Sequence, residues 1–160
     1  MTVVRDGEVV AERAYLGPET TLRQCRSTTK SVMSTLIGIA IEQEKIKSVD
    51  ERVLSFFPDL EGIENVDDRK RAIRIEDLLT MRSGTDYHER GAPDADSPHM
   101  RLNALRRGWD RFYLSRPMVT DPGTHFQYDS GGVVLLSSLI SPSVLRGLST
   151  ERRWRFSTSI

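Results

Sequence analysis

The apolar residues between Ser27 and Glu44 recur every three or four positions, which is the spacing of one face of a helix. They are Val32, Met33, Leu36, Ile37, Ala40 and Ile41. This run predicts a long, well-buried helix that begins at or near Ser27, around which the rest of the chain must pack. Because Ser, Thr and Gly interrupt the run, it is too short an apolar stretch to span a membrane.

A β-hairpin is predicted at the start of the chain. Two short valine-rich segments, residues 2–5 and 8–11, flank the pair Asp6-Gly7. This pair suits a type I′ turn, because both central residues of that turn must adopt positive φ angles.

The remaining apolar patterns predict several shorter elements. A short helix is predicted from Ser48 to its stop at Pro58, followed by a charged connector over 67–71. A brief helix through Leu78 and Met81 ends at Ser83-Gly84, and a polar loop follows over 85–97. One helix is then predicted from Pro98 until Arg116-Pro117 closes it, and a last helix over 133–140. After Ser141 the periodicity disappears.

The charge balance argues against a nucleic-acid partner. Lys and Arg together number 23, as do Asp and Glu, so no overall field favours nucleic acid or an anionic membrane. The single cysteine, Cys25, excludes an intrachain disulfide. The first fifteen residues alternate charge and valine and do not read as a signal peptide, so the chain as written is expected to be soluble and unexported.

The first chemical pattern is the S-x-x-K tetrad formed by Ser27 and Lys30 at the start of the predicted helix. Three residues apart, the two side chains share one face, so the amine can reach the hydroxyl. The N-terminus of the helix also favours negative charge developing on the serine oxygen. The alternative is that Ser27 is only a helix cap and Lys30 only a solvated side chain.

The second pattern is the pair Tyr128 and Ser130, which directly precedes the apolar run from Val133. Two positions apart on an irregular segment, the two side chains can point into one cleft, and a tyrosine there can pass a proton. The alternative is that Tyr128 is a core aromatic with a satisfied hydroxyl.

Four segments together resemble the class C β-lactamases and the DD-peptidase-like serine hydrolases of the penicillin-binding protein type. They are residues 25–32 with the tetrad, Ser48-Val49-Asp50-Glu51 with Phe57-Pro58, residues 75–84, and Pro122-Gly123-Thr124 with Tyr128-Asp129-Ser130. The resemblance covers about residues 2–140. It implies an α+β, β-lactamase/transpeptidase-like fold, with an antiparallel sheet flanked by helices and a helical subdomain.

The same resemblance implies roles for four residues. Ser27 would be the acylated nucleophile, Lys30 its base or proton relay, and Tyr128 the group that passes a proton to the leaving group; which of the two is the base stays open. Ser130 takes the substrate-binding position where the best-known β-lactamases have asparagine. Because serine has a shorter arm, ester or small amide substrates become more plausible.

The third motif of that family, Lys-Thr-Gly or His-x-Gly on a later strand, does not follow Tyr128, since the last lysine is Lys70 and the last histidine is His125. We therefore expect residues 1–140 to form the N-terminal part of a β-lactamase-like domain with its C-terminal strands missing. Residues 141–160 would be a divergent or disordered tail, either native or the product of a frame shift.

Two functions remain open on this sequence. One is a serine hydrolase that acts through an acyl-enzyme on Ser27, with an ester, amide or β-lactam as substrate. The other is a truncated, catalytically inactive homologue or a binding module.

Partners and cofactors follow from the same observations. The spacing of His88, His99 and His125 is unlike a metal site, and we predict neither a metal nor an organic cofactor. The expected partner is a small-molecule or peptide-like substrate. Oligomeric state and localisation stay open, because the family is often periplasmic or secreted whereas this chain shows no export signal.

Overall fold

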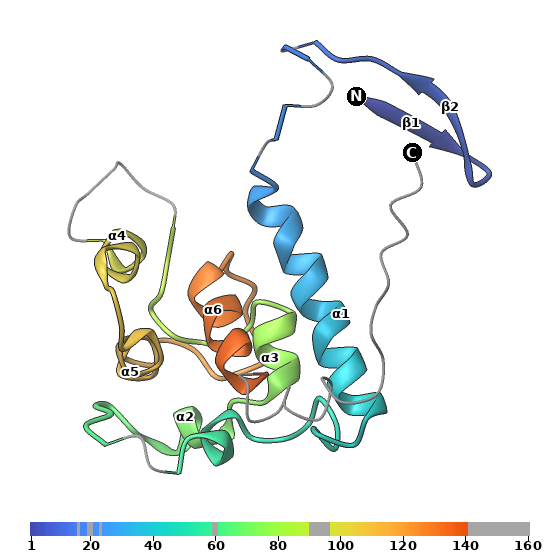
Figure 1. The fold of residues 1–160 in the computed structure, drawn as a ribbon. Helices are drawn as coiled ribbons and strands as arrows, with labels where there is room; N and C mark the ends of the chain where they lie inside the picture. Colours follow the sequence, from blue (N-terminus) through green and yellow to red (C-terminus); the bar gives the residue numbers. More distant parts are fainter. Residues whose placement is uncertain (16, 19–20, 23, 59–60, 90–96, 141–160) are drawn as a thin grey trace.

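The computed structural model describes residues 1–15, 17–18, 21–22, 24–58, 61–89 and 97–140, and the predicted tail at 141–160 lies outside them. Its elements in chain order are β1 (Thr2–Arg5), β2 (Glu8–Glu12), η1 (Arg26–Thr28), α1 (Thr29–Glu42), η2 (Val53–Phe56), α2 (Asp68–Ala72), α3 (Ile75–Leu79), α4 (Pro98–Ala104), α5 (Trp109–Leu114) and α6 (Ser130–Leu139). Figure 1 shows the hairpin apart from the helices, joined to them through the start of α1.

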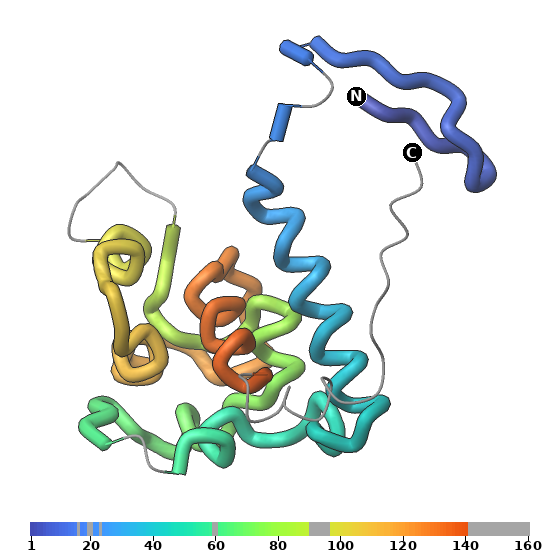
Figure 2. Tube along the Cα trace, in the orientation of Figure 1, coloured from blue at the N-terminus to red at the C-terminus, as the bar shows by residue number. Residues whose placement is uncertain are grey.

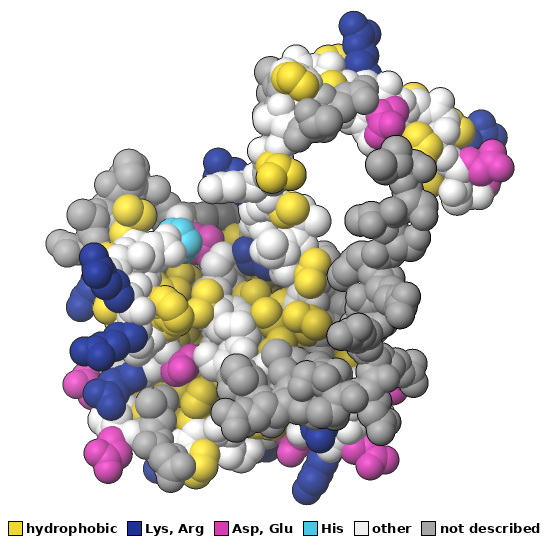
Figure 3. All heavy atoms as spheres, in the orientation of Figure 1, with side chains coloured by type: hydrophobic (Ala, Val, Ile, Leu, Met, Phe, Trp, Pro, Cys, Tyr) yellow, Lys and Arg dark blue, Asp and Glu magenta, His cyan; other side chains and the backbone are white. Residues whose placement is uncertain are grey.

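The hairpin has the turn that the sequence predicts. β1 and β2 pair antiparallel, with Arg5 opposite Glu8. Asp6 and Gly7 have φ angles of 52° and 83°, as a type I′ turn requires. Both strands are exposed along their whole length, and Figure 3 shows apolar side chains on the hairpin surface. Within the described residues this hairpin is the only sheet, so the larger sheet that the resemblance implies stays a prediction.

The predicted apolar helix is present as α1. It is preceded by one turn of 3-10 helix, η1, so α-helical hydrogen bonding begins at Thr29 rather than at Ser27. Ile37 and Ala40 are its fully buried side chains. The helix ends at Glu42, two residues before Glu44, whose φ of 57° turns the chain away.

Helix α6 is the centre of the helical packing. It contacts α1, α3, α4 and α5, and Figure 2 shows it enclosed among them. It begins at Ser130, three residues earlier than the predicted 133–140. The buried apolar residues form one core: Ile37, Ala40, Ile46, Val53, Ile73, Ile75, Leu78, Tyr87, Leu102, Tyr113, Leu114, Met118, Leu135, Leu136, Leu139 and Ile140. Burial of this apolar surface is the main favourable contribution to folding.

The single helix predicted from Pro98 to Arg116 is wrong, because the chain forms two helices there. Helix α4 ends at Ala104, where Leu105 becomes extended, and α5 begins after Gly108, whose φ is 78°. The indole Nε1 of Trp109 donates to the Leu105 carbonyl at 3.0 Å and closes the turn between them. Helical periodicity survives across the break because both helices turn apolar side chains toward the same core.

The helix predicted from Ser48 is also shorter and tighter than expected. Only Val53–Phe56 is helical, and it is the 3-10 helix η2. The flanking backbone is held elsewhere: Val53 N–H donates to the Ile73 carbonyl at 2.9 Å, and Ile75 N–H donates to the Glu51 carbonyl at 3.1 Å. These bonds tie the segment to the start of α3, the brief helix that the sequence predicts.

Residues 67–71, predicted as a connector, instead form the N-cap and most of helix α2. The Asp67 carboxylate caps it by accepting from the backbone N–H of Lys70 at 2.9 Å. The Lys70 side chain is fully buried, and its ammonium donates to the backbone carbonyls of Leu114, at 2.6 Å, and Arg116. Burial lowers the pKa of Lys70 to about 8. A lysine thus fastens α2 to the end of α5.

No helix in the described ranges has both the length and the apolar character needed to cross a membrane.

Two helical glycines provide a matched test of how tightly α6 packs. A Cβ on Gly131 would lie 2.6 Å from the Tyr113 ring and 2.7 Å from the Tyr87 ring, whereas a Cβ on Gly38 in α1 would meet nothing within 4 Å. We expect Gly131→Ala to lower the free energy of unfolding by about 1–3 kcal/mol, because both tyrosines are buried. Gly38→Ala should raise it by about 0.5–1 kcal/mol. Urea unfolding measures both, and equal shifts would contradict this packing.

Candidate active site

Three of the side chains singled out in the sequence meet at one point. Ser27 Oγ accepts a hydrogen bond from Lys30 Nζ at 3.1 Å and another from the Tyr128 hydroxyl at 2.6 Å. Tyr128 lies 101 residues from Ser27 in the chain. The Lys30 ammonium also lies 4.9 Å from the centroid of the Tyr128 ring. All three polar groups therefore lie within reach of one reacting atom.

The turn at the start of α1 presents Ser27 and Lys30. Ser27 lies in the 3-10 turn η1 and Lys30 in the first turn of α1, so both project from the same end of the helix. Arg26, directly before Ser27, has a φ of 47°, in the left-handed region that non-glycine residues rarely occupy. Backbone strain of this kind is concentrated at functional sites.

A buried carboxylate holds the other side of the site. Asp129, between Tyr128 and Ser130, is the N-cap of α6 and accepts from the Gly132 N–H at 2.8 Å. Its second oxygen accepts from the Tyr113 hydroxyl and from the Ser83 hydroxyl, the latter at 3.3 Å. Only 3% of Asp129 is exposed. These bonds fix the backbone at Asp129 and, with it, the direction in which Tyr128 projects.

Ser130 stands apart from that meeting point. It is the first residue of α6, and its backbone N–H donates to the Glu89 carboxylate. Within the described residues, its hydroxyl forms no hydrogen bond with Ser27, Lys30 or Tyr128. Its predicted role in binding substrate stays a prediction.

The surroundings of Tyr128 lower the pKa of its phenol. The main cause is the hydrogen bond with Ser27, followed by the hydrogen-bonding and electrostatic influence of Lys30. The Glu89 carboxylate acts in the opposite direction and raises the pKa of Tyr128. A phenol with a lowered pKa gives up its proton more readily, as a proton-transfer group must.

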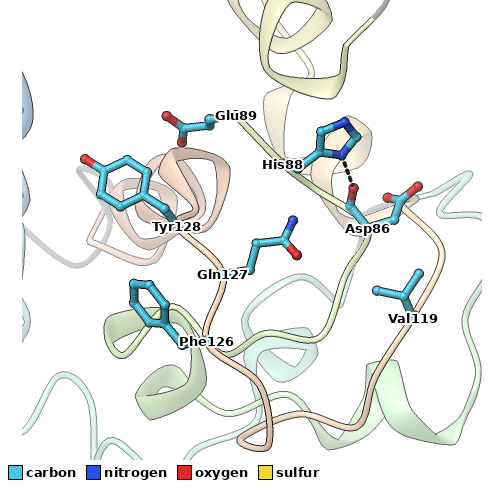
Figure 4. Close-up of a pocket in the computed structure, with 7 residues that line it drawn as sticks. All are labelled: Asp86, His88, Glu89, Val119, Phe126, Gln127 and Tyr128. Atoms are coloured by element: carbon cyan, nitrogen blue, oxygen red, sulfur yellow. Dashed lines mark hydrogen bonds between the residues drawn. The ribbon is translucent and has the colours of Figure 1, made fainter. Parts of the chain in front are cut away.

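A pocket of about 540 Å³ opens beside Tyr128. Its lining residues are Asp86, His88, Glu89, Val119, Phe126, Gln127 and Tyr128. Figure 4 shows Glu89 and Tyr128 next to each other at one end, Phe126 below them, and Asp86 and Val119 at the far end. The pocket therefore joins the Ser27 site through Tyr128.

The residues that the structure describes contain no cluster of three or more His, Cys, Asp or Glu side chains able to hold a metal ion.

Two further residues of the site were not identified from the sequence. Asp129 carried a signal that could have revealed it, because an aspartate three residues before a helical N–H is typical of an N-cap. Glu89 carried no such signal, since it lies in a polar loop without periodicity. Only the fold brings its carboxylate to the start of α6.

Asp129 gives a testable dependence of stability on pH. Burial raises its pKa from 3.8 to about 6, although its hydrogen bonds oppose the rise. A carboxyl whose pKa is raised by folding stabilises the folded state below its unfolded pKa, and this contribution is lost as the pH rises through about 6. Asp129→Asn cannot ionise, so its free energy of unfolding relative to the natural protein should rise by up to about 3 kcal/mol between pH 4 and pH 7.

The measurement is urea unfolding of both proteins across this pH range. Asp121→Asn, at an exposed aspartate, is the matched control and should follow the natural protein at every pH. If the Asp129→Asn curve also runs parallel to that of the natural protein, the buried carboxylate does not titrate as described.

Comparisons with known proteins agree with this arrangement. The family model described as Beta-lactamase matches residues 1–142. Among solved structures, the chain is similar to one titled "Putative 6-aminohexanoate-dimer hydrolase from Bacillus anthracis", with a TM-score of 0.66 and 18% sequence identity. The similarity covers 88% of this chain and 38% of that chain, so this chain spans well under half of its length. At this identity it shows a shared fold. No curated protein matches the chain.

Proposed function

Because the chain belongs to the β-lactamase family, we propose that it is a serine hydrolase whose acyl-enzyme forms on Ser27. The observation that carries the proposal is the pair of hydrogen bonds to Ser27 Oγ from Lys30 Nζ and the Tyr128 hydroxyl. The substrate is an ester, an amide or a β-lactam.

Acylation needs one of the two partners in its basic form, either the neutral amine of Lys30 or the phenolate of Tyr128. Both groups lie within hydrogen-bonding distance of Ser27 Oγ. When Lys30 or Tyr128 has lost its proton, it can accept the Ser27 proton while Oγ forms a bond to the substrate carbonyl carbon. The bond to the leaving group then breaks, and Tyr128 passes a proton to that group. Water releases the acyl group by the reverse sequence of proton transfers.

The two partners are not equivalent in this scheme. The lowered pKa of Tyr128 makes its phenolate more accessible, and its 2.6 Å contact with Ser27 Oγ is the shorter of the two. Lys30 lies against both groups and can return the proton that Tyr128 passes on. This supports Tyr128 as the final proton donor and leaves Lys30 as the relay.

We further propose that the chain is of the class C and DD-peptidase-like type, with Ser130 in the substrate-binding position. The support for this role is its position in the sequence, two residues after Tyr128 and at the first position of α6. The short serine arm favours ester or small amide substrates over β-lactams.

The second candidate is a catalytically silent homologue. It is favoured by one observation, that no Lys-Thr-Gly or His-x-Gly sequence follows Tyr128 in the chain. In this family the strand that carries that motif supplies a backbone donor to the oxyanion hole. Loss of one such donor costs about 10²–10³ in rate, so these residues on their own would react slowly.

Covalent labelling decides between the two candidates. We expect a fluorophosphonate probe to add one label, located at Ser27 by peptide mass spectrometry, and Ser27→Ala to abolish it. Ser34→Ala, an exposed serine on the same helix, is the control and should label normally. If Ser27 stays unmodified under conditions that label a longer member of the family, hydrolysis by this chain is excluded.

The contribution of the phenol is tested by Tyr128→Phe. We expect the second-order rate constant for labelling to fall about 10²–10⁴-fold, because the proton-transfer group is lost while the ring remains. Tyr15→Phe, at an exposed tyrosine near the hairpin, should label at the natural rate. An unchanged rate in Tyr128→Phe would remove this residue from the mechanism.

A further inference from the structure

The pocket beside Tyr128 has a defined chemical direction relative to Ser27. In the proposed function Tyr128 passes a proton to the leaving group, so the leaving group must lie on the Tyr128 side of Ser27. The same side chain forms one end of the pocket of about 540 Å³. A leaving group that lies beside Tyr128 would therefore be next to this pocket.

The walls of this pocket combine apolar surface with two acidic groups. Phe126 and Val119 are 56% and 58% exposed, so they offer apolar surface to a ligand. Asp86 and Glu89 supply the carboxylates. What the pocket would bind depends on which of these charges is already neutralised.

Asp86 is neutralised within the protein. Arg116 donates to both of its carboxylate oxygens, from Nε at 2.7 Å and from a terminal nitrogen at 2.5 Å. A two-point guanidinium–carboxylate pair of this kind satisfies both charges. The Asp86 carboxylate is therefore not available as the counter-ion of a charged ligand.

Glu89 has no such partner. Its side chain is 16% exposed, and within the described residues no Lys or Arg forms an ion pair with it. One carboxylate oxygen accepts the backbone N–H of Ser130. The other lies 3.9 Å from Nδ1 of His99, beyond hydrogen-bonding distance. A carboxylate largely removed from water is electrostatically unfavourable where, as among the described residues here, no Lys or Arg pairs with it, and a ligand cation would offset that cost.

Both ring nitrogens of His99 are engaged by groups other than Glu89. Its Nε2 lies 3.0 Å from the Asn103 side-chain amide nitrogen, and its Nδ1 lies 2.9 Å from the Tyr87 hydroxyl. The other nearby cation, the Lys30 ammonium, contacts Ser27 Oγ and the Tyr128 ring instead of Glu89.

We propose that this pocket recognises a leaving group with a positively charged nitrogen on a short apolar arm, and that Glu89 is its counter-ion. The arm would lie against Phe126, and the charge would lie at the Glu89 end beside Tyr128. The inference rests on the proposed function, because the direction of the leaving group follows from the role of Tyr128. It assigns substrate selection to Glu89, a residue of the polar loop before α4.

The test uses two thioesters of matched shape. Acetylthiocholine carries a trimethylammonium leaving group, and 3,3-dimethylbutyl thioacetate replaces its nitrogen with carbon. We expect the natural protein to have a roughly tenfold higher kcat/KM for the cationic thioester, and Glu89→Gln to reduce the ratio to near one. Glutamine keeps an oxygen for the Ser130 N–H. Glu42→Gln, the same charge change at the far end of α1, should leave the ratio unchanged.

Binding without chemistry separates this inference from the proposed function. Choline and 3,3-dimethyl-1-butanol, the matching alcohols, are titrated by NMR into Ser27→Ala with and without Glu89→Gln. We expect choline to bind more tightly, and only when Glu89 is present. If choline shows that preference while Ser27 of the natural protein stays unlabelled by the fluorophosphonate probe, the pocket assignment stands and the hydrolase proposal fails. The pocket assignment is overturned if Ser27 cleaves both thioesters at equal rates. It is also overturned if choline binds no more tightly than 3,3-dimethyl-1-butanol when Glu89 is present.

Discussion

The buried carboxylate of Asp129 is the interaction on which the site depends. It joins three separate segments: the N-terminus of α6 through Gly132, helix α5 through Tyr113, and the turn before Gly84 through Ser83. An ionised group at 3% exposure is costly, and several donors must converge on it to make it tolerable. Because these bonds converge on Asp129, its backbone can move little. The backbone of its two neighbours, Tyr128 and Ser130, is restricted with it.

Ser27 and Lys30, on the other side of the site, are held by fewer polar contacts. Ser27 and Lys30 are set by the first turns of α1, and in the described residues the hydroxyl contact with Tyr128 is the hydrogen bond that joins them to the α6 side. The position of α1 against α6 depends on apolar packing further along the helix, around Ile37 and Ala40. The distance between Ser27 and the Tyr128 hydroxyl is therefore controlled by the hydrophobic core, about three turns along the helix from Ser27. Core substitutions there would act on the geometry of the site.

The sequence predicted the parts of the molecule that are governed by local rules. The α1 helix and the Asp6-Gly7 turn follow from periodicity and turn chemistry, whereas the expectation that Ser27 and Tyr128 share one site comes from the family resemblance and not from any local rule. The break between α4 and α5 could not be predicted in the same way, because Gly108 is tolerated inside many helical patterns and both helices keep their apolar faces.

Two charged residues show more clearly what a local sequence pattern cannot predict. Lys70 reads as a surface residue in a charged connector, yet its ammonium is buried and donates to the carbonyls of Leu114, the last residue of α5, and of Arg116 just beyond it. Its burial is decided by backbone groups more than 40 residues away, and no local pattern contains that information. Glu89 is a similar case, because its partner is the backbone N–H of Ser130, 41 residues later.

Tyr128 lies between opposite charges, and this arrangement links substrate selection to reactivity. Lys30 lowers the pKa of the phenol, whereas the Glu89 carboxylate raises it. A cationic leaving group beside Glu89 would cancel the second effect and leave the first in place. The pKa of Tyr128 should then fall further when such a substrate binds, and in the proposed scheme the phenolate form able to accept the Ser27 proton would become more populated. A neutral substrate of the same shape would fill the pocket without this change, so the charge on the substrate would act on the acylation step as well as on binding.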